Sequence, residues 1–263
     1  MDRWEQEEKI KASIEDGTIM IHTDGEVIGQ INGLSVLYTG DYRFGQPNKI
    51  TVRTFLGQKG IVNIDRESYL SGPFHAKGLL TLTGYLQGEF AQNKPLPLSA
   101  SITFEQSYAT IDGDSASSTE LFALLSLLAQ LPIKQGIAVT GSVNQWGDIQ
   151  PIGGVNEKVE GFYYTCKANG FTGEQGVMIP VQNVKNLMLR NEVIEAIQNG
   201  MFHVWAVRTV QEGIELLTGV SSGMRDEEGH FPDGTVFGLV EQRLVTMLQM
   251  YQAGKQKQQV SHH

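Results

Sequence analysis

Residues 110–131, TIDGDSASSTELFALLSLLAQL, place two acids and several small hydroxylated residues directly before a long apolar run. The apolar run has the spacing of one helix face, which is formed by Leu121, Leu124, Leu125 and Leu128. Ser117 and Glu120 match a capping box, in which two side chains satisfy free backbone N–H groups at a helix start. Pro132 is expected to stop the helix. The stretch therefore predicts a helix that begins just after Ser115.

Strands and helices alternate on both sides of this stretch. Downstream, the sequence predicts strands over residues 136–141, 176–180 and 202–207, and helices over residues 155–168, 191–200 and 209–219. Upstream, it predicts strands over residues 49–56, 60–64 and 98–106. The alternation from residue 100 onward is typical of an α/β domain.

The two ends of the chain are less regular. A short polar helix is predicted over residues 2–14, followed within residues 17–38 by two strands that turn at Asp24-Gly25, a good hairpin signal. Residues 72–90 fit neither pattern clearly. A breaker-rich linker over residues 220–234 precedes a final helix over residues 235–251, which packs on the domain or on a neighbouring subunit.

Composition narrows the function classes. The chain has 263 residues and a formal net charge of −9, without the clustered Lys and Arg that neutralise nucleic-acid phosphates. Cys166 is the single cysteine, which favours a reducing compartment and a structural thiol. The charged N-terminus has no signal-peptide core, and no apolar run is long enough to span a membrane. These features predict a cytoplasmic protein that binds neither nucleic acid nor membrane.

Ser115 lies where the predicted helix begins, a position that admits two roles. A serine there is usually a cap, because its hydroxyl oxygen accepts hydrogen bonds from backbone N–H groups of the first turn. The same position offers free N–H donors and the positive end of the helix dipole, which stabilise a developing oxyanion. Ser115 is therefore a candidate nucleophile as well as a candidate cap.

A serine nucleophile needs a base to take its proton. His22, His75 and His203 occur singly in or beside predicted strands and are interpreted as core or surface residues, although His75 in GPFHAKG also fits a loop near a cleft. Lys158, in the first turn of the helix after the Gly-rich PIGGVNE, is the other available base. A solvated lysine on an amphipathic helix is its competing interpretation.

Lys158 can act as a base near neutral pH only if its pKa falls from about 10.4 to about 7 or 8, a difference of roughly 4 kcal/mol. The helix dipole supplies only ~0.3 to 2 kcal/mol of this. Burial must provide most of the shift, and the apolar neighbours Val155, Val159 and Phe162 favour such burial.

Asp112 and Asp114 act in the opposite direction. A carboxylate beside Lys158 stabilises the charged amine and raises its pKa. The two acids are interpreted either as turn residues before the helix or as groups that hold the lysine in a resting state until substrate arrives.

Three blocks of sequence match, in the same order, the motifs of a known protein family. These are DGDSAS (112–117), VTGSVNQWGDIQPIGGVNEKVEG (139–161) and MIPVQN (178–183). Together they resemble the proteolytic domain of Lon proteases, especially the LonB type. The interval of 43 positions from Ser115 to Lys158 matches the family's serine–lysine interval. Residues 25–38 resemble the start of that domain, so the resemblance covers roughly residues 25–219.

The resemblance implies roles for individual residues. It implies that Ser115 is the nucleophile and Lys158 the general base of a Ser-Lys dyad that hydrolyses peptide bonds. Thr140 matches the threonine that orients the family's lysine, and Asp114 matches the aspartate of LonB enzymes. Asp112 stands where LonB enzymes usually have a glutamate, which leaves its contact with the lysine open. The implied fold is α/β (α+β), with mixed sheets and packed helices.

The resemblance also implies partners. Family members degrade unfolded or damaged polypeptides as hexamers joined to an AAA+ ATPase module, and extended substrate is expected along an exposed strand edge. No G-x-x-x-x-G-K-[ST] phosphate loop occurs here, so we expect no cofactor in this chain, and ATP and Mg only through an absent ATPase module. Residues 1–24 are interpreted as the tail of a preceding module, residues 25–219 as the proteolytic domain, and residues 220–263 as a linker plus C-terminal helix.

Two other functions fit parts of the pattern. One is a catalytically silent assembly or regulatory module that keeps the Lon-like fold, against which the presence of Ser115, Lys158 and Thr140 argues. The other is a nucleotide-binding α/β domain that uses the Gly-rich turn at residues 151–154, although this turn lacks the lysine and hydroxyl of a phosphate loop.

Overall fold

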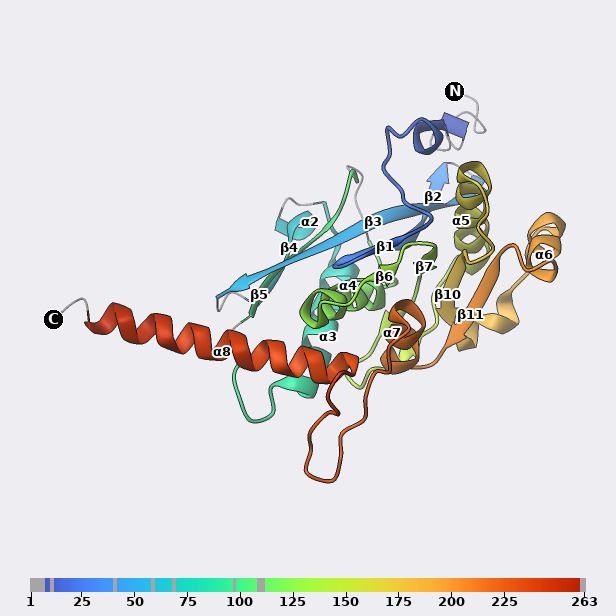
Figure 1. Cartoon of the computed structure of the whole chain (residues 1–263). Helices are drawn as coiled ribbons and strands as arrows, with labels where there is room; N and C mark the ends of the chain where they lie inside the picture. Colours follow the sequence, from blue (N-terminus) through green and yellow to red (C-terminus); the bar gives the residue numbers. More distant parts are fainter. Residues whose placement is uncertain are drawn as a thin grey trace.

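A seven-stranded mixed sheet forms the centre of the computed structural model, which describes residues 8–9, 12–39, 42–57, 60–67, 70–96, 98–107 and 112–260 (Figure 1). The strand order is β11-β10-β7-β2-β3-β5-β4. Only β3 runs against the others in this sheet. The strands are β2 (Gln30–Thr39), β3 (Tyr42–Leu56), β4 (Gly60–Asn63), β5 (Leu98–Phe104), β7 (Ile137–Val139), β10 (Gly176–Pro180) and β11 (His203–Val207). The predicted mixed α/β architecture is confirmed.

Helices cover the two faces of the sheet separately. On one face, α4 (Ser117–Ala129) packs against β2 and β3 and contacts α3 (Pro73–Phe90), α7 (Val210–Thr218) and α8 (Val236–Val260). On the other face, α5 (Val155–Asn169) packs against β2, β3 and β10, beside α6 (Asn191–Gln198). The chain also forms the short α2 (Ile64–Glu67) and the 3-10 helix η1 (Val181–Asn186).

The alternation of side chains along a strand produces two cores. In β10, Met178 belongs to the core shared with α4, whereas Val177 and Ile179 belong to the core shared with α5. Successive strand residues point to opposite faces, so an uninterrupted apolar strand must be covered on both sides. The apolar run at residues 176–180 therefore predicts a strand in the middle of a layered domain, as observed.

The central helix α4 is buried on almost every side, which explains why its apolar residues extend beyond a single stripe. It ends at Ala129, and the left-handed Gln130 that follows, with φ 57°, caps it before Pro132 is reached. The predicted capping box is wrong. Ser117 Oγ instead accepts a hydrogen bond from Val143 N at 3.1 Å, and Glu120 contacts His75, because both side chains point into packed protein.

The predicted hairpin at Asp24-Gly25 is also wrong. The residues before this turn form no strand in the described part of the chain, and the two residues of β1 (Glu26–Val27) pair with β6 (Ile133–Lys134) instead. Gly25 carries a positive φ of 71°, and its carbonyl accepts from Gln135 N at 2.9 Å. The chain does turn at Gly25, but the strand that follows pairs with residues 133–134 and not with the segment before the turn.

The unassigned segment at residues 72–90 is α3. Proline suits the first helical position of this segment, since its missing N–H would have no partner there. One face of the helix enters the core with α4 through Leu79, Leu82, Leu86 and Phe90. The predicted N-terminal helix lies partly outside the described residues, of which 8–9 and 12–15 are helical.

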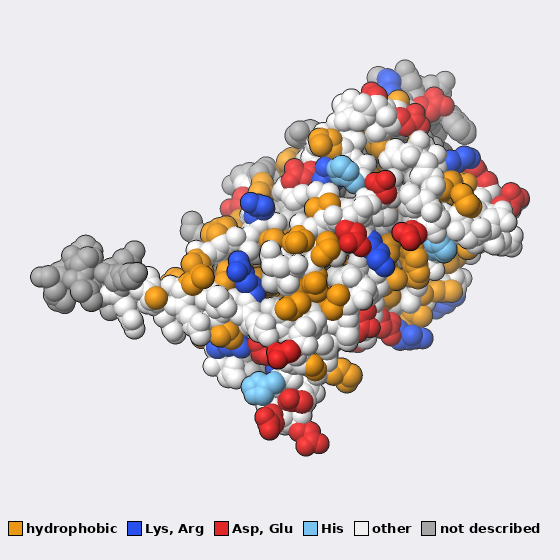
Figure 2. All heavy atoms as spheres, viewed as in Figure 1, with side chains coloured by type: hydrophobic (Ala, Val, Ile, Leu, Met, Phe, Trp, Pro, Cys, Tyr) orange, Lys and Arg blue, Asp and Glu red, His pale blue; other side chains and the backbone are white. Residues whose placement is uncertain are grey.

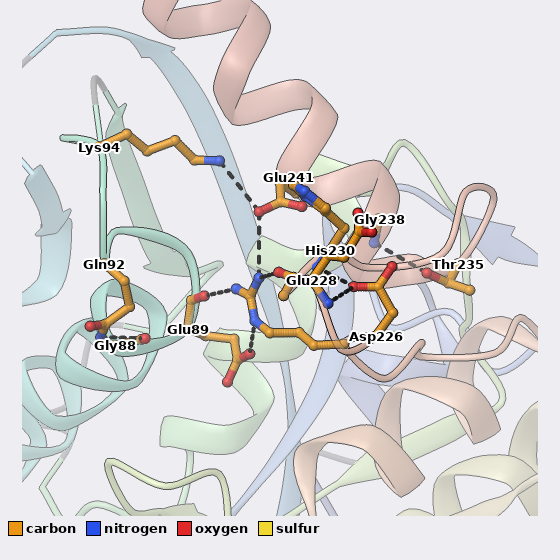
Figure 3. Close-up of polar contacts among 12 residues, drawn as sticks. Gly88, Glu89, Gln92, Lys94, Asp226, Glu228, His230, Thr235, Gly238 and Glu241 are labelled. Atoms are coloured by element: carbon orange, nitrogen blue, oxygen red, sulfur yellow. Dashed lines mark hydrogen bonds and ion pairs between the residues drawn. The ribbon is translucent and has the colours of Figure 1, made fainter.

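The final helix packs back on the domain. The start of α8 is buried against α4, and its far end extends past the body of the molecule (Figure 1). The preceding segment at residues 220–235 is held in place by Arg225, whose guanidinium is 3.5 Å from Glu89 and 3.7 Å from Glu241. Lys94 reaches the same Glu241 carboxylate (Figure 3).

The surface carries charges of both signs. Figure 2 shows acidic and basic side chains interspersed over the visible face, with Lys and Arg in small separate groups. Among the described residues, none of the helices combines the length and apolar character that a membrane span requires.

Candidate active site

Three residues that are distant in sequence meet beyond the carboxyl end of β7. Ser115 lies in the turn before α4, Lys158 lies in the first turn of α5, and Thr140 directly follows β7. The Lys158 Nζ donates hydrogen bonds to Ser115 Oγ and to Thr140 Oγ1, both at 3.0 Å. Lys158 is only 3% exposed and Thr140 only 2%. The structure therefore brings together an alcohol, an amine and a second hydroxyl inside the protein.

Hydrogen bonds connect the turn that carries Ser115 to the segment that follows β7. Gly141 N donates to the Ser115 carbonyl at 2.8 Å, and the Gly141 carbonyl accepts from both the backbone N and the hydroxyl of Ser118, at 3.2 and 2.7 Å. Thr140 belongs to the same segment, with its N–H donating to the Met178 carbonyl at 3.1 Å. Ser115 and Ser118 thus connect the start of α4 to the segment that follows β7.

Glycines let α5 approach closely enough to deliver Lys158. A Cβ on Gly45 of β3 would lie 1.9 Å from the Glu157 carbonyl oxygen and 2.8 Å from the Lys158 Cα, so a side chain cannot be accommodated. Gly161, one turn later in α5, meets the Gly45 backbone in the same way. Gly154 begins the helix with a left-handed φ of 68°, which suits glycine.

Burial determines the protonation of Lys158. Loss of solvation lowers the pKa of Lys158 to about 8, although the carboxylates of Asp114 and Glu157 act to raise it. Arg43 lies 3.5 Å from Glu157 and offsets part of that charge. Burial thus outweighs the nearby acids, as expected from the apolar neighbours of Lys158.

The two acids before Ser115 occupy different places. Asp114 is one of the charges that act on Lys158, and its side chain is exposed. Asp112 turns to the start of α3, where its Oδ1 accepts from Phe74 N at 3.1 Å and from His75 N at 3.4 Å. The Asp112 carboxylate therefore lies at the start of α3, whereas the charges that act to raise the pKa of Lys158 are those of Asp114 and Glu157.

The three histidines and Cys166 occupy different surroundings. His75 is 1% exposed within α3, so its interpretation as a core residue is confirmed and the alternative of a loop near a cleft is wrong. His22 is exposed, and His203 Nε2 lies 2.8 Å from the Gly173 carbonyl. Cys166 is fully buried, and loss of solvation raises the pKa of its thiol, which keeps it protonated as expected of a structural cysteine.

Sequence reasoning missed two features of the site. A glycine inside a strand often marks a close backbone approach, so Gly45 carried a usable signal once β3 was known to include it. The buried pair of His75 and Glu120, whose side chains are 3.0 Å apart, could not be predicted from the sequence. The two residues lie in different helices, and their contact depends on how those helices pack.

Comparison with known proteins agrees with this geometry. Residues 102–218 match the family described as the Lon protease (S16) C-terminal proteolytic domain. Two bacterial proteins named "Putative Lon protease homolog" are similar to this chain. The one from Escherichia coli (strain K12) is 46% identical over 212 residues, and the one from Haemophilus influenzae is 41% identical over 214 residues. These matches cover 80% and 81% of this chain and 36% of each relative.

More distant relatives come from archaea. The Archaeal Lon protease of Methanocaldococcus jannaschii is 32% identical over 208 residues, which cover 75% of this chain and 29% of that protein. The chain thus spans about a third of the length of the curated relatives it matches. The family match and these relatives together show that this chain belongs to the Lon protease family, of which it carries the C-terminal proteolytic domain.

Proposed function

We propose that this chain is a serine endopeptidase in which Ser115 is the nucleophile and Lys158 is the general base. The supporting observation is the 3.0 Å contact between Lys158 Nζ and Ser115 Oγ, made inside the protein by a lysine whose pKa is lowered to about 8. A nucleophile within hydrogen-bond reach of a base of suitable pKa is the arrangement that acyl transfer needs.

The reaction follows from this contact. When Lys158 is neutral, its lone pair takes the proton from Ser115 Oγ while the oxygen attacks the peptide carbonyl carbon. The C–N bond then breaks as the ammonium of Lys158 returns the proton to the leaving amine. Water then attacks the resulting ester while Lys158 takes a proton from that water. The ester C–O bond breaks, the acyl group leaves as a carboxylic acid, and the ammonium of Lys158 returns the proton to Ser115 Oγ.

Backbone donors are proposed for the oxyanion. The N–H groups of Ser117 and Ser118 are already used, since they donate to the Asp114 and Gly141 carbonyls at 3.0 and 3.2 Å. This leaves the N–H groups of Ser115 and Ala116, next to the positive end of α4, as the proposed donors. Asp114 is proposed to keep Lys158 charged in the resting state, because its charge acts to raise the pKa of Lys158.

The substrates, the assembly and the cellular location are proposed from membership of the Lon protease family. We propose polypeptide substrates in unfolded or damaged proteins, a homo-hexamer, an AAA+ ATPase module in the full-length protein and a cytoplasmic location. We further propose that residues 25–219 form the proteolytic domain, between a tail at residues 1–24 and a C-terminal segment at residues 220–263. The chemistry uses side chains and backbone alone, so ATP and Mg enter only through the ATPase module.

The pH dependence of Ser115 reactivity tests the proposal. The reactive form contains neutral Lys158, so modification of Ser115 by a serine-directed peptide electrophile should accelerate with rising pH and level off above a midpoint near the pKa of about 8. Rates measured from about pH 6 to about pH 10, with the adduct mapped by mass spectrometry, provide the readout. A rate independent of pH, or an adduct on another residue, would contradict the dyad and favour a catalytically silent module.

Replacement of Thr140 by valine should lower activity and shift its pH profile. Valine has a similar shape but cannot accept the hydrogen bond from Lys158 Nζ, so the lysine is less well oriented and kcat should fall about 10- to 100-fold. The lost acceptor had favoured the charged amine, so the midpoint should move below about 8. Peptide hydrolysis across pH measures both effects. Thr140→Ser keeps the hydroxyl and should remain close to wild type.

A further inference from the structure

Asp112 and Glu120 flank Ser115 along the chain, and both are tied to the first turn of α3. Asp112 Oδ1 accepts from Phe74 N and His75 N, at 3.1 and 3.4 Å, and Glu120 Oε1 lies 3.0 Å from His75 Nε2. The N-cap residue of α3 is Gly72, which has no side chain to accept hydrogen bonds. Asp112 therefore supplies the cap from another segment of the chain. The nucleophile turn is thus bound to one short stretch of α3 before and after Ser115.

The attachment after Ser115 is buried. His75 is 1% exposed and Glu120 is 0% exposed, so their contact is enclosed by packed protein. Burial acts to lower the pKa of His75, but the hydrogen bond and charge of Glu120, with the charges of Asp65 and Asp112, raise it overall. The contact between His75 and Glu120 favours one geometry, because separating the two side chains breaks a buried hydrogen bond.

The helix also lies directly against the nucleophile turn. A Cβ on Gly78, one turn after His75, would lie 3.2 Å from the Ser117 Cβ and 3.3 Å from the Asp114 Cβ. At Gly78, α3 therefore lies close to Asp114, the residue before Ser115, and to Ser117, two residues after it. If the hydrogen bonds of Asp112 to α3 are lost, the turn that carries Ser115 is expected to shift against α3, where the two segments are tightly packed.

We propose that Asp112 is a positioning residue, which holds Ser115 in reach of Lys158 by capping α3. It acts through the backbone of the nucleophile turn and not through its charge on the lysine. The charges that act on Lys158 are those of Asp114 and Glu157. This inference rests on the proposed function, because positioning matters only if Ser115 reacts. Displacement of a nucleophile by about 1 Å costs about 100-fold in rate, so the cap has a measurable effect.

The test compares Asp112→Ala with Asp112→Asn in the full chain, using a serine-directed peptide electrophile on Ser115. Alanine removes the cap, so the maximal rate of labelling should fall about 10- to 100-fold, with an unchanged concentration for half-maximal rate. Asparagine keeps an oxygen that caps helices well, so it should retain most of the wild-type rate. Both variants should keep the pH midpoint near about 8.

Asp226→Ala is the matched control. Asp226 is another exposed aspartate whose Oδ1 accepts backbone N–H bonds, from Glu228 at 3.0 Å and His230 at 2.8 Å, in the segment before α8. Its replacement removes the same kind of contact away from Ser115, and it should leave labelling unchanged. Thermal unfolding of each variant shows whether a lost rate reflects lost fold.

Different outcomes overturn different statements. If Asp112→Ala labels as fast as wild type, the positioning role is overturned while the dyad stands. If Asp112→Asn falls as far as Asp112→Ala, or if either variant moves the pH midpoint, Asp112 acts through its charge and the inference is again overturned. If wild-type Ser115 is not labelled at all, and Ser115→Ala behaves identically, the proposed function itself fails and the inference falls with it.

Discussion

Replacement of Ser115 by alanine should abolish hydrolysis of an unstructured polypeptide while leaving the fold unchanged. Removing a serine nucleophile leaves only the catalysis that binding and oxyanion stabilisation provide, so the rate should fall by at least about 10³-fold. The Ser115 hydroxyl contacts Lys158 at the edge of the interior, and Lys158 keeps its contact with Thr140 after the change. The free energy of unfolding should therefore change by less than about 1 kcal/mol.

Ser221→Ala provides the matched control for this experiment. Ser221 is an exposed serine in the segment before α8, where its backbone carbonyl accepts from Val236 N at 2.9 Å, a contact that alanine preserves. Casein-like unfolded substrate and a short peptide should both be cleaved at wild-type rates by this variant. Residual activity of Ser115→Ala equal to that of the control would rule out Ser115 as the nucleophile.

Replacement of Lys158 by methionine should abolish activity and stabilise the fold at the same time. Methionine fills a similar volume but cannot take a proton, so the rate of peptide hydrolysis should fall by about 10³-fold or more. Combining it with Ser115→Ala should add almost nothing, because the two residues act as one unit. Arginine at this position stays charged and should be inactive as well.

The gain in stability follows from linkage. The pKa of Lys158 falls from 10.5 to about 8 on folding, so between these values the unfolded chain binds more protons than the native protein. The free energy of unfolding due to this group therefore rises as pH increases from about 8 to about 10.5, and at neutral pH the buried charge destabilises the fold. Lys158→Met removes that charge and should raise the free energy of unfolding by about 1 to 3 kcal/mol at pH 7.

Denaturant unfolding of the wild type and of Lys158→Met at neutral and alkaline pH measures this effect. The advantage of the methionine variant should shrink as pH rises through about 8 towards 10.5, because wild-type Lys158 then becomes neutral in the fold. Lys134→Met, on an exposed residue of β6, is the control and should show no such dependence. A methionine variant that is less stable at every pH would show that Lys158 is not a destabilising buried charge.

Much of the architecture was predictable because local pattern and burial agree. Residues 176–180 are apolar on both faces and form a central strand, and the helical spacing after Ser115 produces α4. The proposed pairing of Ser115 with Lys158 was predicted from the resemblance of these motifs to those of Lon proteases. The burial of Lys158 was predicted from its apolar neighbours, and the side chain is 3% exposed. The hairpin at Asp24-Gly25 failed because β6 competes for that strand, which local turn chemistry cannot reveal.

The sequence by itself determined which groups are available and in which local elements they stand: an alcohol at a helix start, an amine in the first turn of another helix, and two acids before the alcohol. Only the tertiary structure decided that Asp112 caps α3 while Asp114 acts on Lys158. The reason is that hydrogen bonds and charge interactions extend over a few ångströms in space. Their partners are set by how the helices pack against the sheet, and Gly45 and Gly78 permit that packing through contacts with segments far away in the chain.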